Sequence, residues 1–217
     1  QCGRVPSGPH LTGNSGVARM PLRQAVAGLK SECLVIAEHG RGVFVRSRPS
    51  VRRLASDRFA RRHREVGKAA FLAETESIGT PSVDQLEVAQ IVPPERVAER
   101  LKLRKTAKVV CRDRRYLIDG IPVELATTYV PLAIARGTLI TSQDTGPGGV
   151  YARIEEAGHQ LASFTEEVGA RMPTPKERRR LSLPEGTPVI TVVRVAYAVD
   201  GRPVEMTDTV KSAPSYV

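Results

Sequence analysis

The sequence has no tryptophan, few aromatic residues and no long apolar run, and these absences narrow what the chain can be. Aromatic residues make up 4% of its 217 residues, which disfavours a surface that binds single-stranded nucleic acid by stacking bases. No apolar run approaches the roughly 18 to 20 residues that a membrane-spanning helix needs. The opening residues do not show the basic-then-apolar pattern of a secretory leader, so we expect none. We therefore expect a globular protein without a membrane partner.

Cysteine and histidine are scarce as well. The three cysteines are widely separated and odd in number, which suits reduced thiols in the cytoplasm better than a disulfide framework. None of the four histidines has metal-ligand spacing to another histidine or to a cysteine. Neither a Gly-x-Ser-x-Gly motif nor a phosphate-binding glycine loop before a helix occurs. The expectation is no metal, no cofactor and no catalytic residue.

Positive charge is abundant, and it is concentrated in the first third of the chain. Residues 1–70 hold 14 Lys and Arg against 4 Asp and Glu, while residues 71–217 hold 19 of each. Such asymmetry favours a polyanion-binding module joined to a neutral one. Because aromatic residues are few, double-stranded DNA is the favoured partner. The alternative is a solvated charged surface.

Residues 17–33 have the periodicity of an amphipathic helix. Pro21 is tolerated in a first helical turn, so the helix is expected to begin near Ala18. Apolar runs at 34–36 and 43–45 bracket a glycine-rich tip and predict a β-hairpin. A helix followed by a small basic hairpin is the layout of a winged helix-turn-helix, whose helix enters the major groove of DNA.

Three stretches of this segment resemble motifs of the GntR-type bacterial transcription regulators, in order and in spacing. They are Pro-Ser-Gly-Pro-His-Leu at 6–11, Gly-Val-Ala-Arg-Met-Pro-Leu-Arg-Gln-Ala at 16–25 and Gly-Arg-Gly-Val-Phe-Val at 40–45. The resemblance implies a winged helix over residues 1–47. The implied DNA-binding residues are Ser7, Arg19, Arg23, Arg41 and Gly42. The family's first helix would precede Pro6, so this head is expected to be incomplete at its N-terminus.

The next residues are dense in arginine. We expect a basic linker at 48–57 and a second domain at 58–217. The linker arginines are interpreted either as a solvated connector or as additional phosphate contacts, each of which steepens the salt dependence of binding by about 0.9 log units.

From residue 67 onward, extended runs alternate with short helices, which predicts an antiparallel α+β domain. Extended runs are expected at 68–78, 83–92, 108–118, 121–130, 161–171, 189–199 and 202–210. Helices are expected at 94–103, 132–136, 149–157 and 175–183. Asp119-Gly120 and Asp200-Gly201 each predict a two-residue hairpin turn.

An internal repeat with a spacing of 81 residues joins these turns. Ile-Asp-Gly-Ile-Pro-Val-Glu at 118–124 matches Val-Asp-Gly-Arg-Pro-Val-Glu at 199–205. The same spacing pairs two tyrosines, Tyr116 and Tyr197. Two copies predict a pseudo-symmetric sheet rather than a solenoid, with a ligand pocket near Glu124 and Glu205. The alternative is that both glutamates satisfy backbone donors or face solvent.

This segment resembles the UTRA domain, the effector-binding domain of the HutC branch of GntR regulators, which has a chorismate-lyase-like fold. The resemblance rests on Asp-Gly-x-Pro at 119–122, Thr-Tyr-Val-Pro at 128–131, Val-Tyr at 150–151 and Pro-Val-Glu at 203–205. It implies an effector site at Arg114, Tyr116, Tyr151, Glu205 and Tyr216, to which the repeat adds Glu124. Arginine and a helix N-terminus suit an anion.

These observations predict a ligand-responsive bacterial transcription regulator of the repressor type. It would bind double-stranded operator DNA as a homodimer, since palindromic operators mirror two-fold symmetry. A small effector with anionic character would release it. The alternative is a lyase-type enzyme in which Arg114, Tyr116 and Glu205 bind a carboxylated aromatic, although a shared fold does not imply a shared activity.

Overall fold

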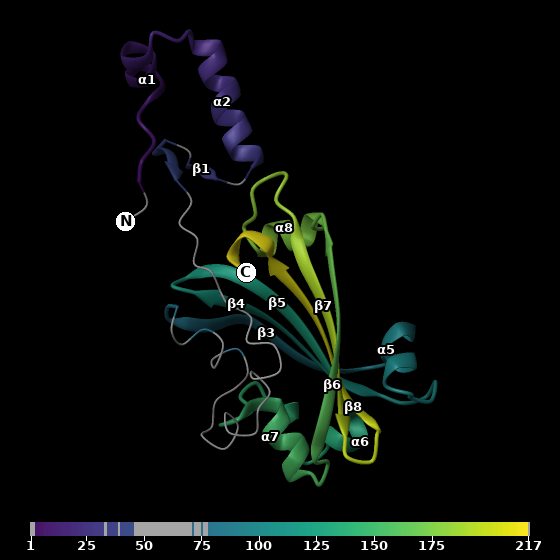
Figure 1. Cartoon of the computed structure of the whole chain (residues 1–217). Coiled ribbons are helices and arrows are strands. Elements are labelled where there is room, and N and C mark those ends of the chain that lie inside the picture. Colours follow the sequence, from purple (N-terminus) through teal and green to yellow (C-terminus); the bar gives the residue numbers. More distant parts are fainter. Residues whose placement is uncertain are drawn as a thin grey trace.

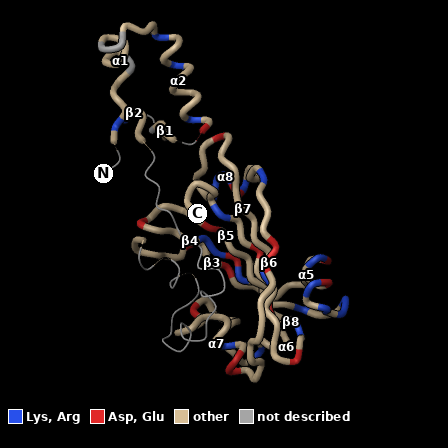
Figure 2. The backbone as a smooth tube through the Cα atoms, in the orientation of Figure 1, with Lys and Arg blue, Asp and Glu red and all other residues tan. Residues whose placement is uncertain are grey.

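The computed structural model describes residues 3–32, 34–38, 40–45, 71, 75 and 78–216. Residues 3–45 form a small head, and residues 78–216 form a larger domain around a six-stranded sheet (Figure 1). The expected linker at 48–57 lies outside the described residues. Figure 2 shows that the positions of acidic and basic residues are interspersed along the backbone of the larger domain.

The described head has two helices followed by a hairpin, in the order expected for a winged helix-turn-helix that lacks its first helix. Its elements are α1 (Gly8–Ser15), α2 (Arg19–Ser31), β1 (Val35–Glu38) and β2 (Gly42–Val45). Helix α2 begins directly after Ala18, as predicted, and β1 and β2 pair antiparallel. Residues 3–5 lie along β2, where the Val5 amide donates to the Val43 carbonyl over 2.8 Å.

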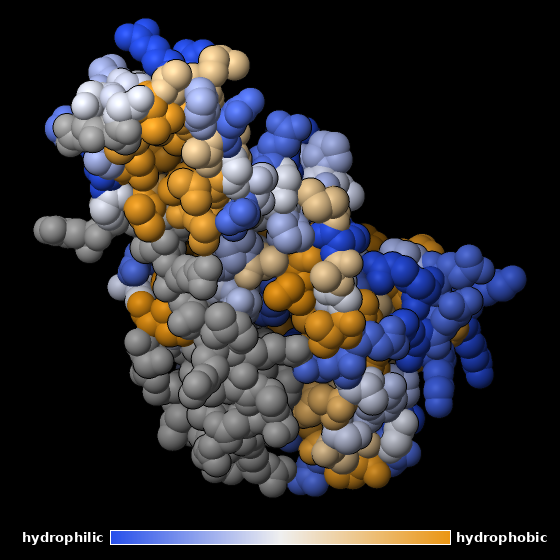
Figure 3. All heavy atoms as spheres, turned by 45° about the horizontal axis from the view of Figure 1, so that its top comes forward, coloured by the Kyte–Doolittle hydropathy of each residue, from blue (hydrophilic) through white to orange (hydrophobic). Residues whose placement is uncertain are grey.

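Apolar side chains of the head are incompletely covered. No described residue of α2 is buried, and Figure 3 shows apolar atoms gathered on the surface of the head. A hollow of about 420 Å³ lies between α1, α2 and β2, lined in part by Leu11, Leu22, Val26 and Val43.

The larger domain is an antiparallel α+β domain, as the sequence predicts. The strand order is β3 (Pro81–Ile91), β4 (Val109–Ile118), β5 (Ile121–Pro131), β8 (Pro203–Ser212), β7 (Val189–Ala198) and β6 (Leu161–Arg171). The principal helices are α5 (Glu95–Arg100), α6 (Leu132–Ala135), α7 (Gly149–Glu156) and α8 (Pro175–Arg180). Each predicted helix is present, although α5 and α8 end earlier than expected.

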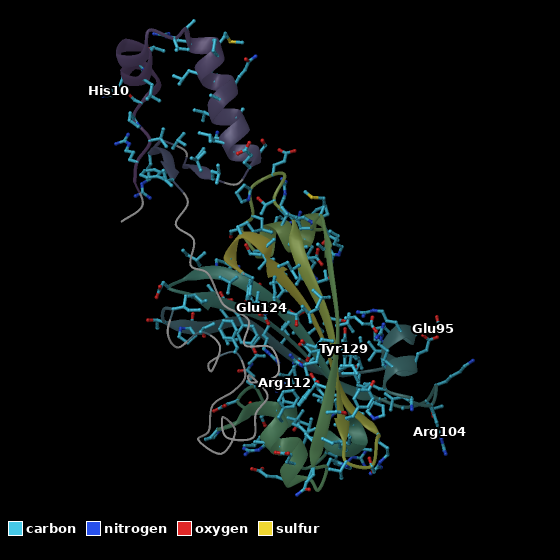
Figure 4. The ribbon with its side chains drawn as sticks, in the orientation of Figure 1. His10, Glu95, Arg104, Arg112, Glu124 and Tyr129 are labelled. Carbon is cyan, nitrogen blue, oxygen red and sulfur yellow. The ribbon has the colours of Figure 1, made fainter. Side chains whose placement is uncertain are left out.

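Successive residues of each strand face opposite sides of the sheet, and the two sides are covered by different helices. On one side, Val110 and Val130 pack with Ile154 of α7. On the other, Val109 and Tyr129 pack with Val97 of α5. Figure 4 accordingly shows Glu95 of α5 on the opposite side of the sheet from Arg112 and Glu124.

The repeat produces two halves, β3-α5-β4-β5 and β6-α8-β7-β8, that meet where β5 pairs with β8. The helices bind these halves together, because each packs against strands of the other half. Val97 of α5 contacts the cluster of Val195 and Met206, on β7 and β8. Leu181, directly after α8, packs with Leu125 of β5. The hydrophobic core is therefore shared by the two halves.

Two details of the predicted secondary structure are wrong. Residues 68–78 were expected to be extended, but the backbone is helical at Phe71 and Thr75, where the Thr75 hydroxyl donates to the Phe71 carbonyl over 2.8 Å. Asp119-Gly120 is the predicted two-residue turn, with φ of 50° and 76°. The second turn has three residues, because the Ala198 amide bonds to the carbonyl of Arg202. Because this turn has one more residue than the first, the spacing between equivalent residues of the two halves increases by one after the turns.

That extra residue also corrects the pairing of the tyrosines. The starts of β4 and β7 are 80 residues apart, and the spacing becomes 81 only after the turn. Tyr116 lies opposite Glu124, whereas Ala196 lies opposite Glu205. The structural counterpart of Tyr116 is therefore Ala196 rather than Tyr197.

Candidate functional site

A cavity of about 510 Å³ lies on the side of the sheet that carries α7. Its floor is formed by β4, β5, β7 and β8, and its walls by Phe71, by Val83 and Leu86 of β3, and by residues 143–151. This volume falls within the usual range for small-molecule sites. The cavity spans both halves of the repeat, as the sequence predicts.

Arg112 of β4 fixes one wall of the cavity. Its Nη1 donates to the carbonyl of Ile140 over 2.8 Å and also to that of Ser142, and its Nη2 donates to the carbonyl of Gln143 over 2.7 Å. Burial, together with the positive charge of nearby Arg114, lowers the pKa of Arg112 to about 10. The side chain thus remains charged at neutral pH, and its donors hold the loop that precedes α7.

Arg114 lies two residues further along β4, on the same side of the sheet. Its Nε donates to the Tyr116 hydroxyl over 2.6 Å, and its Nη2 donates to the Thr128 hydroxyl over 2.9 Å. The Tyr116 ring stacks on Phe71, with ring centroids 4.1 Å apart. The guanidinium is therefore held by neutral groups, in a position lining the cavity.

Glu205 of β8 lies at the centre of a buried cluster. Its Oε1 accepts from the Thr207 hydroxyl and lies 3.7 Å from Nη2 of Arg194, and its Oε2 accepts from the Tyr151 hydroxyl over 3.3 Å. Burial raises the pKa of Glu205. The positive charge of Arg194 and the hydrogen bonds from Thr207 and Tyr151 oppose that shift. Thr207 also bonds Thr128 over 2.8 Å. This contact connects the cluster to Arg114.

Glu124 of β5 forms a second buried cluster at the other end of the floor. It lies opposite Lys211 of β8 and makes an ion pair with its ammonium group. The Tyr216 hydroxyl donates to Oε2 of Glu124 over 2.8 Å. Lys211 and Glu124 are 2% and 3% exposed, so neither glutamate of the repeat faces solvent or satisfies backbone donors alone.

Comparison with known proteins agrees with this architecture. The family model of the UTRA domain matches residues 78–216, which include the whole sheet and its cavity floor. The chain belongs to the GntR family of transcriptional regulators that carry a UTRA domain. It is 31% identical over 209 residues to an HTH-type transcriptional regulator of Mycobacterium tuberculosis, covering 94% of this chain and 72% of that protein.

Other relatives are named as repressors. The HTH-type transcriptional repressor NagR of Bacillus subtilis is 24% identical, with 98% of this chain and 82% of the repressor covered. The histidine utilization repressor of Pseudomonas aeruginosa is 28% identical, with 88% and 71% covered. A crystal structure of a GntR-family regulator superimposes with a TM-score of 0.67 at 27% identity, covering 99% of this chain and 86% of the other. Head and UTRA domain therefore follow the layout of this family.

The UTRA domain brings most of the predicted effector residues together. Arg114, Tyr116, Glu124, Tyr151 and Glu205 all line the cavity. Tyr216 is not among the lining residues, but its hydroxyl donates to Glu124. Their role in binding an effector stays a prediction.

Sequence reasoning missed several residues of the site. Arg112, Thr128, Arg194 and Thr207 line the cavity, and Lys211 neutralises Glu124. Arg194 could have been found from the repeat, because the spacing of 80 that holds before the turns makes it the equivalent of Arg114. The spacing of 81 concealed that match.

The predicted DNA-binding residues lie on the head. Ser7 is the N-cap of α1, and Arg19 and Arg23 are exposed on α2. Arg41 lies at the hairpin, with its guanidinium carbon 5.9 Å from the centroid of the Phe44 ring. Gly42 has φ of 122°, and a β-carbon there would lie 3.2 Å from Nε of Arg4. Their contact with DNA stays a prediction.

Over the described ranges, no helix is long and apolar enough to cross a membrane. The same part of the chain contains no group of three His, Cys, Asp or Glu residues arranged to hold a metal ion.

Proposed function

We propose that this regulator is a cytoplasmic repressor whose homodimer binds operator DNA through the head and releases it when a small anion occupies the UTRA cavity. Effector binding need only favour a dimer in which the spacing of the heads no longer matches the operator half-sites. Relatives named as repressors support the direction of this response.

The observation that carries the proposal is the environment of Arg114. Its guanidinium lines a cavity of ligand size and is held by two hydroxyl groups, with no described carboxylate in ion-pair contact. A partly buried cation without a counter-ion is costly, and an arriving anion removes that cost.

The head is tested with DNA selected from a random duplex pool by the full chain. Arg23→Ala should weaken binding by about 1–3 kcal/mol and relax sequence discrimination. Arg104→Ala is the matched control, because Arg104 is exposed in the loop after α5 (Figure 4). Equal gel shifts for wild type and Arg23→Ala would remove α2 from the DNA interface.

We propose further that the cavity binds its ligand without converting it. Among the described residues that line it, there is no histidine, cysteine, serine or lysine. Its two glutamates are held by buried cations and hydroxyl groups rather than poised for proton transfer. Incubation of the purified chain with chorismate should yield no product by chromatography, and sustained turnover would favour the lyase alternative.

A further inference from the structure

The charged side chains on the floor of the cavity fall into matched and unmatched groups. A further carboxylate, that of Asp144, lies exposed on the wall, where its Oδ1 accepts from the Gly146 amide. Each carboxylate of the floor has its own buried cation: Lys211 pairs with Glu124, and Arg194 faces Glu205. These two pairs leave no uncompensated negative charge on the floor. On the floor, a ligand with an ammonium group would therefore have to displace a buried cation to reach a carboxylate, and the exposed Asp144 of the wall is the remaining carboxylate of the described lining.

Arg112 and Arg114 are the unmatched group. Neither has a described carboxylate within ion-pair distance, and the carboxylates that act on them at longer range are Asp144 on Arg112 and Glu205 on Arg114. Arg112 directs its Nη donors to loop carbonyls and contributes through its field alone. Arg114 retains its Nη1, which has no partner among the described residues. One planar guanidinium with one open edge suits one oxyanion.

Near this cation the lining combines aromatic and aliphatic side chains with the hydroxyls of Thr128 and Thr207, which are already bonded to Arg114, to each other and to Glu205. The Phe71 and Tyr116 rings are stacked at 25° to each other, and the Tyr116 hydroxyl accepts a hydrogen bond from Nε of Arg114. Val83 and Leu86 lie on the same side, and Ala126 lies opposite Arg114 on β5. Across the floor, the Tyr151 ring is met edge-on by Phe164. Such surfaces favour a flat unsaturated body over one covered with hydroxyl groups.

We propose that the effector is an aromatic or conjugated organic anion, with one oxyanion on Arg114 and an otherwise uncharged flat body against Tyr116 and Phe71. This inference rests on the proposed function only in taking the cavity as the effector site. The oxyanion belongs either to a carboxylate or to a phosphate ester, and the experiment separates these sources.

The experiment measures binding of simple probes to the full chain without DNA. Salicylate is suitable because it is fluorescent and the chain has no tryptophan to interfere. Competition then compares benzoate and trans-cinnamate with phenyl phosphate, cyclohexanecarboxylate, inorganic phosphate, glucose 6-phosphate and phenethylamine. We expect the flat carboxylates to bind at least about tenfold more tightly than the saturated acid, the sugar phosphate and the amine. Phenyl phosphate binding more tightly than benzoate would assign the oxyanion to a phosphate ester.

Variants locate the two contacts separately. Arg114→Met, which preserves side-chain length, should weaken cinnamate binding by at least about tenfold, and Arg114→Lys by less. Tyr116→Leu should reduce the preference for cinnamate over cyclohexanecarboxylate toward unity while leaving both acids bound. Arg104→Met, remote from the cavity, should bind all probes as wild type does.

Three results would overturn the inference: glucose 6-phosphate or phenethylamine binding most tightly, Arg114→Met binding cinnamate normally, or equal affinity for flat and saturated acids. Its failure is distinguishable from that of the proposed function. Aromatic anions that bind without releasing DNA would contradict the repressor mechanism alone. Release of DNA by a sugar phosphate, with no binding of aromatic anions, would contradict this inference alone.

Discussion

The two halves of the UTRA domain place an arginine at equivalent positions and surround it differently. Arg114 lies opposite Ala126 in the first half, and Arg194 lies opposite Thr207 in the second. Arg194 is buried and faces Glu205, whereas Arg114 is half-buried and contacts hydroxyl groups. The difference arises from the neighbours rather than from the backbone, which repeats closely.

This contrast separates the charges that hold the fold from those that can hold a ligand. A buried ion pair is strongly destabilised when one member is removed, because the other is left uncompensated. Removing a cation that has no ion-pair partner leaves no buried charge uncompensated. The matched clusters of Glu124 and Glu205 should therefore govern stability, and Arg114 should govern binding.

The largest effect is expected when the buried ion pair of Lys211 and Glu124 is broken. Lys211→Met leaves Glu124 buried without its cation and should lower the free energy of unfolding by about 3 kcal/mol. Arg114→Met should lower it by about 1 kcal/mol or less, since it removes hydrogen bonds to neutral hydroxyls. Urea denaturation followed by circular dichroism measures both. The double variant Lys211→Met/Glu124→Leu should recover much of the loss. Equal destabilisation by Lys211→Met and Arg114→Met would contradict the distinction between charges that stabilise the fold and charges that bind a ligand.

The helices of the two halves provide a smaller contrast. Helix α8 has a capping box, in which Thr174 and Glu177 satisfy each other's backbone amides. The equivalent helix α5 begins after Pro94, with no side-chain cap. Thr174→Ala should therefore cost about 1 kcal/mol of stability, and Pro94→Ala should change it by about 0.5 kcal/mol at most. Thermal unfolding compares them, and a greater loss for Pro94→Ala would contradict the assignment of the caps.

The sequence predicts the repeated framework better than the charges within it. Strand alternation and the Asp-Gly turns are local signals, so β4, β5, β7 and β8 were expected close to their observed bounds. The three-residue second turn was not, because its extra residue is defined by the Ala198–Arg202 hydrogen bond rather than by composition. That one residue concealed the equivalence of Arg114 and Arg194.

The local sequence pattern also could not predict which charged side chains would be buried. Lys211 lies in an unremarkable stretch of β8, and its partner Glu124 is 87 residues away in the chain. Whether such a lysine is solvated or paired depends on which strands become neighbours. Phe71 is a similar case: its place in the cavity depends on stacking with Tyr116 rather than on the extended run that its neighbours suggested.

The smallest expected effect concerns pH and again separates the halves. Hydrogen bonds from Arg171, and then from Thr174, lower the pKa of Glu177 from 4.5 to about 2. Because the folded-state pKa is depressed, the stabilisation from Glu177 is present above the unfolded pKa and is lost as pH falls from about 4.5 toward 2. Its equivalent in α5 is Val97, which cannot titrate. Glu177→Gln should therefore cost about 0.5 kcal/mol at pH 7 and progressively less in acid, measured by urea denaturation from pH 7 to pH 3. A cost that stayed constant over this range would show that the cap geometry, and not the charge of Glu177, supplies the stabilisation.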